Sequence, residues 1–360
     1  MARTFNRLFE RIATFEALHA GYLRARAGKR TRAEVQHFER DLEGNLIELL
    51  NELLHGTYRT GAYRSFAIYE PKRREVAALP FRDRIVQHAL CAVIEPIFED
   101  RFIAHNYACR PGRGTHRGAD AVQTMLRRVK RDHGQVYALK ADISAYFASI
   151  DHAVLKGLFR KRIACRPTLA LLDQIIDSAD QLHSTAGVGL PIGNLVSQLA
   201  ANVYLHELDL HVKHGLRERY YVRYMDDFVI LHHDKAHLQR VREHLDGWLH
   251  HWLRLRTNSK TQVFPVGLIR GRAIDFLGYR IYATHRRLRT NSVARISHTL
   301  RRLAKWYGRG LVPLQRVTAS VTSWLAHAAH ADSRGLVRAV LGKVALHPPQ
   351  SSNPIAPTPP

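Results

Sequence analysis

The stretch Tyr220-Tyr-Val-Arg-Tyr-Met-Asp-Asp-Phe-Val-Ile-Leu231 places two adjacent carboxylates, Asp226 and Asp227, inside an apolar run. Aspartate is depleted in β-strands, and two neighbouring anions repel each other. A chain can hold such a pair at the tip of a hairpin if a cation binds there. The alternative is a solvated Asp-Asp turn, which the strand-forming residues on both sides disfavour. We therefore expect a hairpin over residues 220–233 with the two carboxylates at its tip.

A third carboxylate, Asp142, ends another short apolar run, Val136-Tyr-Ala-Leu-Lys-Ala-Asp142. Three carboxylates on two strands are the parts of a two-metal phosphoryl-transfer site. We therefore predict catalytic and metal-binding roles for Asp142, Asp226 and Asp227, with two Mg²⁺ ions that Mn²⁺ could replace. Asp142 and Asp226 are expected to bridge both ions. The sequence leaves open whether Asp227 binds an ion directly.

The charge of the chain indicates a polyanionic partner. The sequence holds 55 basic and 31 acidic residues, for a net charge of +24, which exceeds what solubility requires of a domain. The basic residues are spread along the chain, and no apolar stretch approaches the length of a membrane span, so no membrane partner is expected. Three scattered cysteines and an N-terminus without a signal-peptide core predict a cytoplasmic setting.

The remaining pattern predicts an α+β fold, in which helices back a small antiparallel sheet in a split βαβ arrangement. Helical segments are expected at both ends, in residues 1–57 and 291–346. Between them we expect an extended segment at 63–80, helices at 81–98 (ending near Pro96), 194–213 (capped by Asn194) and 236–253, and strands at 261–266 and 274–283.

Several side chains are candidates for binding a nucleotide. Phe147 lies five residues after Asp142, where its ring could exclude a 2′-hydroxyl from the incoming sugar; the alternative is a core residue on the following turn. Lys72 and Arg74 belong to a basic run that could clamp a triphosphate or could simply be solvated. Lys260 could contact the leaving pyrophosphate or be exposed.

Taken in order, these segments resemble the conserved blocks of reverse transcriptases over roughly residues 60–335. The first two fingers blocks are matched by Arg82-Asp-Arg-Ile-Val-Gln87 and Tyr107-Ala-Cys-Arg-Pro-Gly-Arg-Gly-Thr-His116. The catalytic blocks are matched by Lys140-Ala-Asp142 through Asp151 and by Tyr224-Met-Asp-Asp227. The block beside the templating base is matched by residues 190–204. Phe276-Leu-Gly-Tyr279 is similar to the primer grip. Several blocks in order are specific, whereas any one alone would be weak.

The resemblance implies a right-hand polymerase architecture. Its parts would be an N-terminal helical extension (1–57), fingers (58–135), a palm with the catalytic aspartates (136–285), a helical thumb (286–346) and a disordered proline-rich tail (347–360). Template RNA, primer or cDNA, and deoxynucleoside triphosphates are the implied partners. The implied nucleic-acid contacts are Arg110, Arg113, Leu277, Gly278, Arg301 and Arg302.

The fourth block also indicates a subfamily. Group II intron enzymes usually carry Pro-Gln-Gly and then Ser-Pro there, whereas this chain has Pro191-Ile192-Gly193 and Ser197-Gln198. That departure, and residues 323–332, are similar to the enzymes of diversity-generating retroelements. This likeness implies a bacterial or phage-encoded enzyme that makes cDNA with errors opposite template adenines, and that works with a small, basic, ring-forming accessory protein. Ile192 and Gln198 would then lie near the nucleotide, and Ile192 would relax the grip on it.

Two other functions stay open on the sequence. One is a group II intron-like, retron or phage-defence reverse transcriptase. The other is an RNA-binding scaffold that does not polymerise. The intact carboxylates disfavour a scaffold, because a scaffold has no need to concentrate anions that repel each other.

Overall fold

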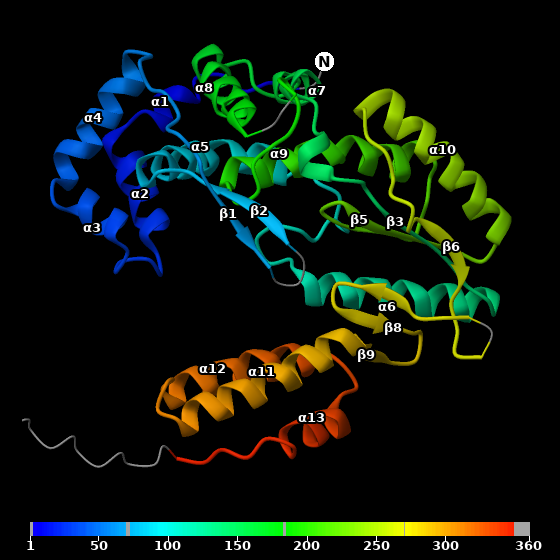
Figure 1. The fold of residues 1–360 in the computed structure, drawn as a ribbon. Coiled ribbons are helices and arrows are strands. Elements are labelled where there is room, and N and C mark those ends of the chain that lie inside the picture. Colours follow the sequence, from blue (N-terminus) through cyan, green and yellow to red (C-terminus); the bar gives the residue numbers. More distant parts are fainter. Residues whose placement is uncertain (1–2, 70–72, 183–184, 270, 349–360) are drawn as a thin grey trace, which may run out of the picture. The chain divides into compact units, whose positions relative to one another are not determined.

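The structure is a computed structural model that describes residues 3–69, 73–182, 185–269 and 271–348. The chain divides into two compact units (Figure 1). Unit 1 comprises residues 1–114, 139–230 and 236–262, and unit 2 comprises residues 115–138, 231–235 and 263–360. The mixed α and β composition confirms the predicted fold class. None of the helices in the described ranges has the length and apolarity needed to cross a bilayer.

Four helices form the N-terminal part of unit 1, as the sequence predicts: α1 (Phe9–Ile12), α2 (Phe15–Arg26), α3 (Ala33–Glu39) and α4 (Leu42–Leu54). The Thr14 hydroxyl caps α2 by accepting a bond from the Ala17 amide at 3.1 Å. α2 packs closely on α5 (Phe81–Glu99). A Cβ at Gly21 would lie 2.6 Å from the Ile85 carbonyl oxygen, so this close approach requires glycine.

The helix predicted over residues 81–98 is confirmed, because α5 spans Phe81–Glu99 and runs three residues past Pro96. A proline removes only its own amide and does not prevent later residues from bonding. The amides of Arg101 and Phe102 both bond to the Phe98 carbonyl and close the last turn. Phe98 is buried there and stacks edge-on against Phe159 at 5.4 Å.

The predicted extended segment forms an antiparallel hairpin of β1 (Arg64–Ile68) and β2 (Arg74–Ala78), with Phe66 opposite Val76. The Ala77 amide in β2 donates to the Ile192 carbonyl at 3.2 Å. This bond fixes the loop that carries Ile192 against the hairpin. Lys72 lies outside the described residues.

The central sheet has the strand order β4-β5-β3-β6. Its strands are β3 (Tyr137–Asp142), β4 (Tyr221–Tyr224), β5 (Asp227–His232) and β6 (Gln262–Pro265), and β4 and β5 form the predicted hairpin. Around it lie α7 (His152–Arg160), α8 (Arg166–Asp177), α9 (Leu195–Leu210) and α10 (Lys235–Leu253). Within unit 1, α9 packs against both α5 and α7 (Figure 1).

The ends of α9 differ from the prediction in two respects. Asn194 occupies the N-cap position, but its side chain makes no capping bond and instead donates to the Tyr63 hydroxyl at 3.4 Å. At the other end, a π-helical turn over His211–Gly215 continues the helix. The helix therefore extends two residues past the predicted end at residue 213, through a change of helical geometry.

Unit 2 contains α6 (Thr115–His133), a sheet of β7 (Ile274–Phe276), β8 (Tyr279–Ile281) and β9 (Arg286–Leu288), and the helices α11 (Thr290–Gly308), α12 (Leu314–Ala328) and α13 (Arg334–Leu341). The helical C-terminal segment is as predicted, whereas β9 was not predicted. Arg286 of β9 bonds to Asp120 of α6 and lies over the Tyr279 ring at 5.2 Å. Of the predicted disordered tail, residues 349–360 lie outside the described residues.

Candidate active site

The hairpin turn presents Asp226 at its tip, whereas Asp227, predicted to share the tip, is the first residue of β5. Tyr224 pairs with Asp227 across the hairpin, so Met225 and Asp226 are the two turn residues. Met225 has a φ of 54°, a region that residues with a side chain rarely adopt. Such backbone strain persists only where surrounding contacts impose it, and it concentrates at functional sites.

Asp142 lies beside this tip because β3 ends there. The Ile143 amide, one residue after Asp142, donates to the Asp226 carbonyl oxygen at 3.3 Å. The Asp142 carboxylate accepts a bond from the Asn258 side-chain amide, and the Asn258 backbone amide bonds to the Asp142 carbonyl at 2.8 Å. The loop after α10 therefore orients Asp142, which sequence reasoning did not anticipate.

Lys140 is a second residue that sequence reasoning missed. Its ammonium group binds the Asp227 carboxylate at 2.9 Å, and both side chains are about three-quarters buried. A signal was present in the sequence, because Lys140 and Asp142 are two residues apart on one strand and so share a face. Asp227 is thus neutralised by a protein cation, whereas Asp226 has no such partner in the described residues.

Burial, and after it the nearby charge of Asp142, raise the pKa of Asp226 to about 6. Burial likewise raises the pKa of Asp227 to about 6, although the Lys140 ammonium lowers it. Both shifts show that ionised carboxylates are unfavourable here without a compensating cation. This is the electrostatic situation in which a divalent ion is bound.

The donor set fits Mg²⁺, but not as a closed protein cage. Within the described ranges, no group of three or more His, Cys, Asp and Glu side chains is arranged to hold a metal ion. The reason is visible for Asp227, whose oxygen is occupied by Lys140. Mg²⁺ is usually held by one or two carboxylates together with waters and substrate phosphates. Asp142 and Asp226 supply that pair, which Asp227 adjoins.

A fully buried ion pair supports the strained turn at Met225 and Asp226. Arg223 binds Asp209 of α9 through two bonds of 2.7 and 2.6 Å, and neither side chain is exposed. The remaining guanidinium nitrogen donates to the Met225 carbonyl at 2.9 Å, and Tyr221 donates to Asp209 at 2.8 Å. This network holds the backbone of Met225 in its positive-φ conformation.

The predicted nucleotide-binding residues of unit 1 within the described ranges include Arg74, Phe147, Ile192 and Gln198, which lie on separate elements. The positive charge of Arg74, at the start of β2, lowers the pKa of Asp226 and therefore lies near it. Phe147 is half-buried in a short 3₁₀ helix, and its carbonyl accepts a bond from the Leu190 amide at 2.7 Å. Ile192 is 37% exposed, and Gln198 is half-buried in the first turn of α9.

Lys260 is exposed in the loop between α10 and β6. Its backbone amide donates to the Asn258 side-chain oxygen at 2.8 Å. Since Asn258 also bonds to Asp142, this loop connects Lys260 to the carboxylates through a single residue. Its role toward pyrophosphate stays a prediction.

The two arginines of the segment 107–116, Arg110 and Arg113, differ in their surroundings. Arg110 is buried and donates to the Glu99 carboxylate at 2.7–2.9 Å and to the carbonyls of Ile103 and Asn106. This geometry gives Arg110 a structural role, so we do not propose it as a nucleic-acid contact. Arg113 is exposed over the Tyr107 ring at 5.7 Å and stays a candidate.

The candidates in unit 2 lie on a turn and on a helix. Leu277 and Gly278 form the two-residue turn between β7 and β8, with φ values of 51° and 90°. Two positive φ values match a type I′ hairpin turn, and they explain the glycine. Arg301 and Arg302 are exposed on α11, and Arg302 lies over the Trp306 ring at 5.0 Å.

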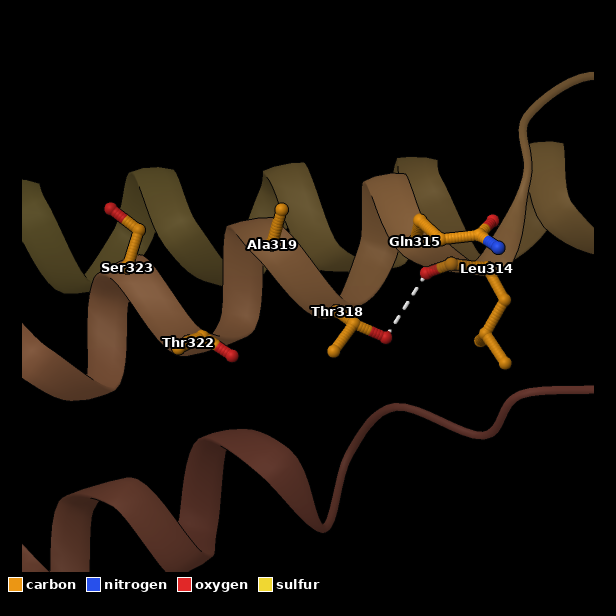
Figure 2. A pocket seen from close by; sticks show the side chains of 6 residues that line it. All are labelled: Leu314, Gln315, Thr318, Ala319, Thr322 and Ser323. Carbon is orange, nitrogen blue, oxygen red and sulfur yellow. Dashed lines mark hydrogen bonds between the residues drawn. The ribbon is translucent and has the colours of Figure 1, made fainter.

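Unit 2 also contains an open groove of about 590 Å³ along α12 (Figure 2). Figure 2 shows its lining residues on α12: Leu314, Gln315, Thr318, Ala319, Thr322 and Ser323. The Thr318 hydroxyl donates to the Leu314 carbonyl at 3.1 Å. The groove has no titratable side chain, so it offers hydroxyl and amide contacts but no acid–base chemistry.

Comparison with known proteins decides the family. The model of the family described as "Reverse transcriptase (RNA-dependent DNA polymerase)" matches residues 70–281, which include Asp142, Asp226 and Asp227. The chain belongs to the reverse transcriptase family. The predicted enzyme class, RNA-directed DNA polymerase, is thereby confirmed for the family, whereas assignment to a diversity-generating retroelement stays a prediction.

This reverse transcriptase is similar to several curated proteins. It is 31% identical to protein YkfC of Escherichia coli (strain K12) in an alignment of 275 residues, and the alignment covers 65% of this chain and 70% of YkfC. It is 30% identical to the group II intron-encoded protein LtrA of Lactococcus lactis subsp. cremoris over 178 residues, 47% of this chain but only 28% of LtrA. A solved telomerase from Candida albicans, in complex with an RNA fragment, aligns with a TM-score of 0.45 and 10% identity, covering 84% of this chain and 59% of that one.

Proposed function

We propose that this chain extends a primer with deoxynucleotides on an RNA template, with Asp142 and Asp226 as the ligands of divalent cations. The observation that supports this most directly is the pairing of the two carboxylates at the end of β3 and the tip of the β4–β5 hairpin. Divalent ions bound there would neutralise charge on the reacting phosphates and lower the pKa of the attacking hydroxyl.

The protein residues around the carboxylates have positioning roles in this proposal. Asn258 fixes the Asp142 carboxylate, and Arg223 fixes the backbone that carries Asp226. Lys140 neutralises Asp227, so the net charge facing the substrate is set mainly by two carboxylates. Such preorganisation matters because a small misplacement of the reacting groups lowers the rate strongly.

The nucleotide would bind on the side of the β1–β2 hairpin. Arg74 would contact its phosphates, since the charge of Arg74 already acts on Asp226. Phe147 would lie under the sugar and exclude a 2′-hydroxyl. Lys72 and Lys260 are further proposed contacts to the phosphates, and Arg113, Leu277, Gly278, Arg301 and Arg302 to template and primer.

The finer role that we propose is error-prone cDNA synthesis from a template-repeat RNA, for diversification of a target gene. Ile192 supports it, because an exposed apolar side chain stands where group II intron enzymes carry an amide. One polar contact to the nascent base pair would then be missing, which relaxes the grip on the nucleotide. A small, basic, ring-forming accessory protein is the proposed partner, and a bacterial or phage-encoded cytoplasmic enzyme the proposed setting.

The second candidate is a group II intron-like reverse transcriptase, which the similarity to LtrA favours. An RNA-binding scaffold is the alternative outside enzymes. Primer extension on an RNA template separates these functions. We expect the native chain to extend the primer with Mg²⁺, and D226N to lose extension while still binding RNA. The surface variant D173N, in which an aspartate outside the site is changed, is the matched control.

Sequencing of the cDNA tests the finer role. The native chain should misincorporate opposite template adenines, and I192Q should reduce those errors. An unchanged error rate in I192Q would refute the role of Ile192, and faithful copying by the native chain would favour the intron-like function. If the native chain binds RNA without extending any primer, the scaffold function holds instead.

A further inference from the structure

A pocket in unit 1 is lined by basic groups that the polymerase site does not use. It has a volume of about 380 Å³ and lies where the end of α5, the end of α7 and one face of α9 meet. Four apolar side chains from these helices form part of its wall. The charged and polar lining is Asp100, Arg101, Lys161, Arg162, His206 and Glu207.

Two buried nitrogen atoms at this pocket have no hydrogen-bond partner among the described residues: Nη1 of Arg162 and Nδ1 of His206. Buried polar groups in folded proteins are nearly always bonded, and leaving a charged donor unbonded is costly. A guanidinium nitrogen can only donate, so its missing partner must be an acceptor. The imidazole can donate through Nδ1 in one of its tautomers, which suits the same acceptor.

The cationic side chains of the pocket also lie close enough to repel one another. Burial lowers the pKa of Arg162, and the positive charge of Arg101 lowers it further. Arg101 likewise contributes to the lowered pKa of His206, for which burial is the largest cause. Mutual repulsion between two guanidinium groups is relieved when an anion binds between them.

The acidic residues of the lining do not cancel this charge. Lys161 pairs with Glu207 at 3.1 Å, so that acid is already neutralised. Asp100 is exposed, so water screens its charge. Three basic against two acidic side chains leave a net charge of +1 around the pocket, before His206 is counted.

The backbone on one side of the pocket is held in place by the N-terminal segment. The Phe5 amide donates to the Arg162 carbonyl, and the Ala164 amide donates to the Phe5 carbonyl, both at 2.8 Å. The His206 ring packs edge-on against Phe102 at 5.5 Å. The Arg162 backbone and the His206 ring are therefore positioned by contacts that do not depend on a ligand.

We propose that this pocket binds a phosphate group between Arg101, Arg162 and His206, separately from the polymerase site. A phosphate has the acceptor oxygens that a guanidinium fork and an imidazole N–H can share. Two sources present this chemistry: a free phosphate-bearing small molecule, or a backbone phosphate of bound RNA. The proposal goes beyond the polymerase function and does not depend on it.

Titration of the full chain with inorganic phosphate, followed by calorimetry or thermal shift, tests the site. The titration is made at constant ionic strength with chloride as the balancing anion, and without divalent ions, primer or nucleotide. We expect saturable binding of phosphate to the native chain. R162Q should bind phosphate more weakly by roughly tenfold or more, because it loses a hydrogen bond between charged groups. R160Q is the matched control, because Arg160 lies two residues away and pairs with Asp173 instead. It should bind phosphate as the native chain does.

Two further variants keep the test decisive. R101Q changes an exposed residue, so it should fold normally and still weaken phosphate binding. D226N disables the polymerase site and should leave phosphate binding intact, which separates this proposal from the polymerase function. The proposal would be overturned if R162Q, R101Q and R160Q bound phosphate equally, or if the native chain showed no saturable binding. Water would then be the occupant of the pocket.

A salt titration of RNA binding distinguishes the two sources of phosphate. If an RNA backbone phosphate occupies the pocket, R162Q should lower the slope of log K against log salt by about one relative to R160Q. If a free small molecule occupies it, the two slopes should be equal while inorganic phosphate still binds the native chain more tightly than R162Q.

Discussion

Replacing Asp226 by asparagine should stabilise the chain in the absence of divalent ions. Burial and the charge of Asp142 raise the pKa of Asp226 from 3.8 to about 6. A shift of about two pKa units corresponds to about 3 kcal/mol between the two protonation states. Water screens part of this because the side chain is partly exposed, so we expect D226N to gain about 1–2 kcal/mol in free energy of unfolding at pH 7.5.

The pH dependence of this gain identifies its cause. A carboxyl group whose pKa is raised on folding destabilises the native state once it ionises, so the penalty is complete above about pH 6. Below about pH 3 the group is protonated in both the folded and the unfolded chain, and the penalty vanishes. The advantage of D226N should therefore be present at pH 7.5, shrink as the pH falls from 6 to 4, and be lost at pH 3.

Urea denaturation with and without Mg²⁺ measures both effects. Added Mg²⁺ should stabilise the native chain by binding its folded state and should stabilise D226N much less, so that the difference shrinks or reverses. D173N is the control, because the Asp173–Arg160 pair lies at the surface and contributes little. A D226N variant less stable than the native chain at pH 7.5 without metal would refute the argument from like-charge repulsion.

Three further predictions concern the same site. R223M leaves Asp209 as a buried charge without its cation, so it should lower the free energy of unfolding by about 3–5 kcal/mol, as measured by denaturation. In steady-state primer extension it should lower kcat by a larger factor than it raises KM. A loss of under about 1 kcal/mol would contradict the supporting role of the ion pair. F147A should admit ribonucleotides, seen as a smaller preference for deoxynucleotides in single-nucleotide extension, and an unchanged preference would make Phe147 a core residue. Protons compete with Mg²⁺ for carboxylates whose pKa is about 6. The stabilisation of the folded chain by Mg²⁺ should therefore be small at pH 5 and reach a plateau above pH 7. A stabilisation that does not change with pH would place the ion elsewhere.

The sequence predicted the carboxylates well because their signal is local. Two aspartates inside a strand-forming run indicate a hairpin tip without any knowledge of the rest of the fold, and the structure places the turn at Met225 and Asp226. The helices were predictable for the same reason, since an apolar period is a property of neighbouring residues. The three-residue strand β9 has two arginines and too short a pattern to be recognised.

The partners of the carboxylates were not predicted, because they depend on contacts between distant residues; only the shared face of Lys140 and Asp142 pointed to one of them. Lys140 binds Asp227 from 87 residues away, and Asn258 binds Asp142 from 116 residues away. Arg110 illustrates a further limit: the resemblance implied a nucleic-acid contact there, whereas in the structure Glu99 at the end of α5 binds its guanidinium group. Charge in a loop predicts a partner without showing whether the partner lies inside the protein.

The most direct test of the central claim is to locate Mn²⁺ by anomalous X-ray scattering in crystals of the chain with a primer–template duplex and a nucleotide. We expect Mn²⁺ within bonding distance of carboxylate oxygens of Asp142 and Asp226, beside the phosphates of the nucleotide. Bound nucleic acid and nucleotide with no ion at these two carboxylates would contradict the account.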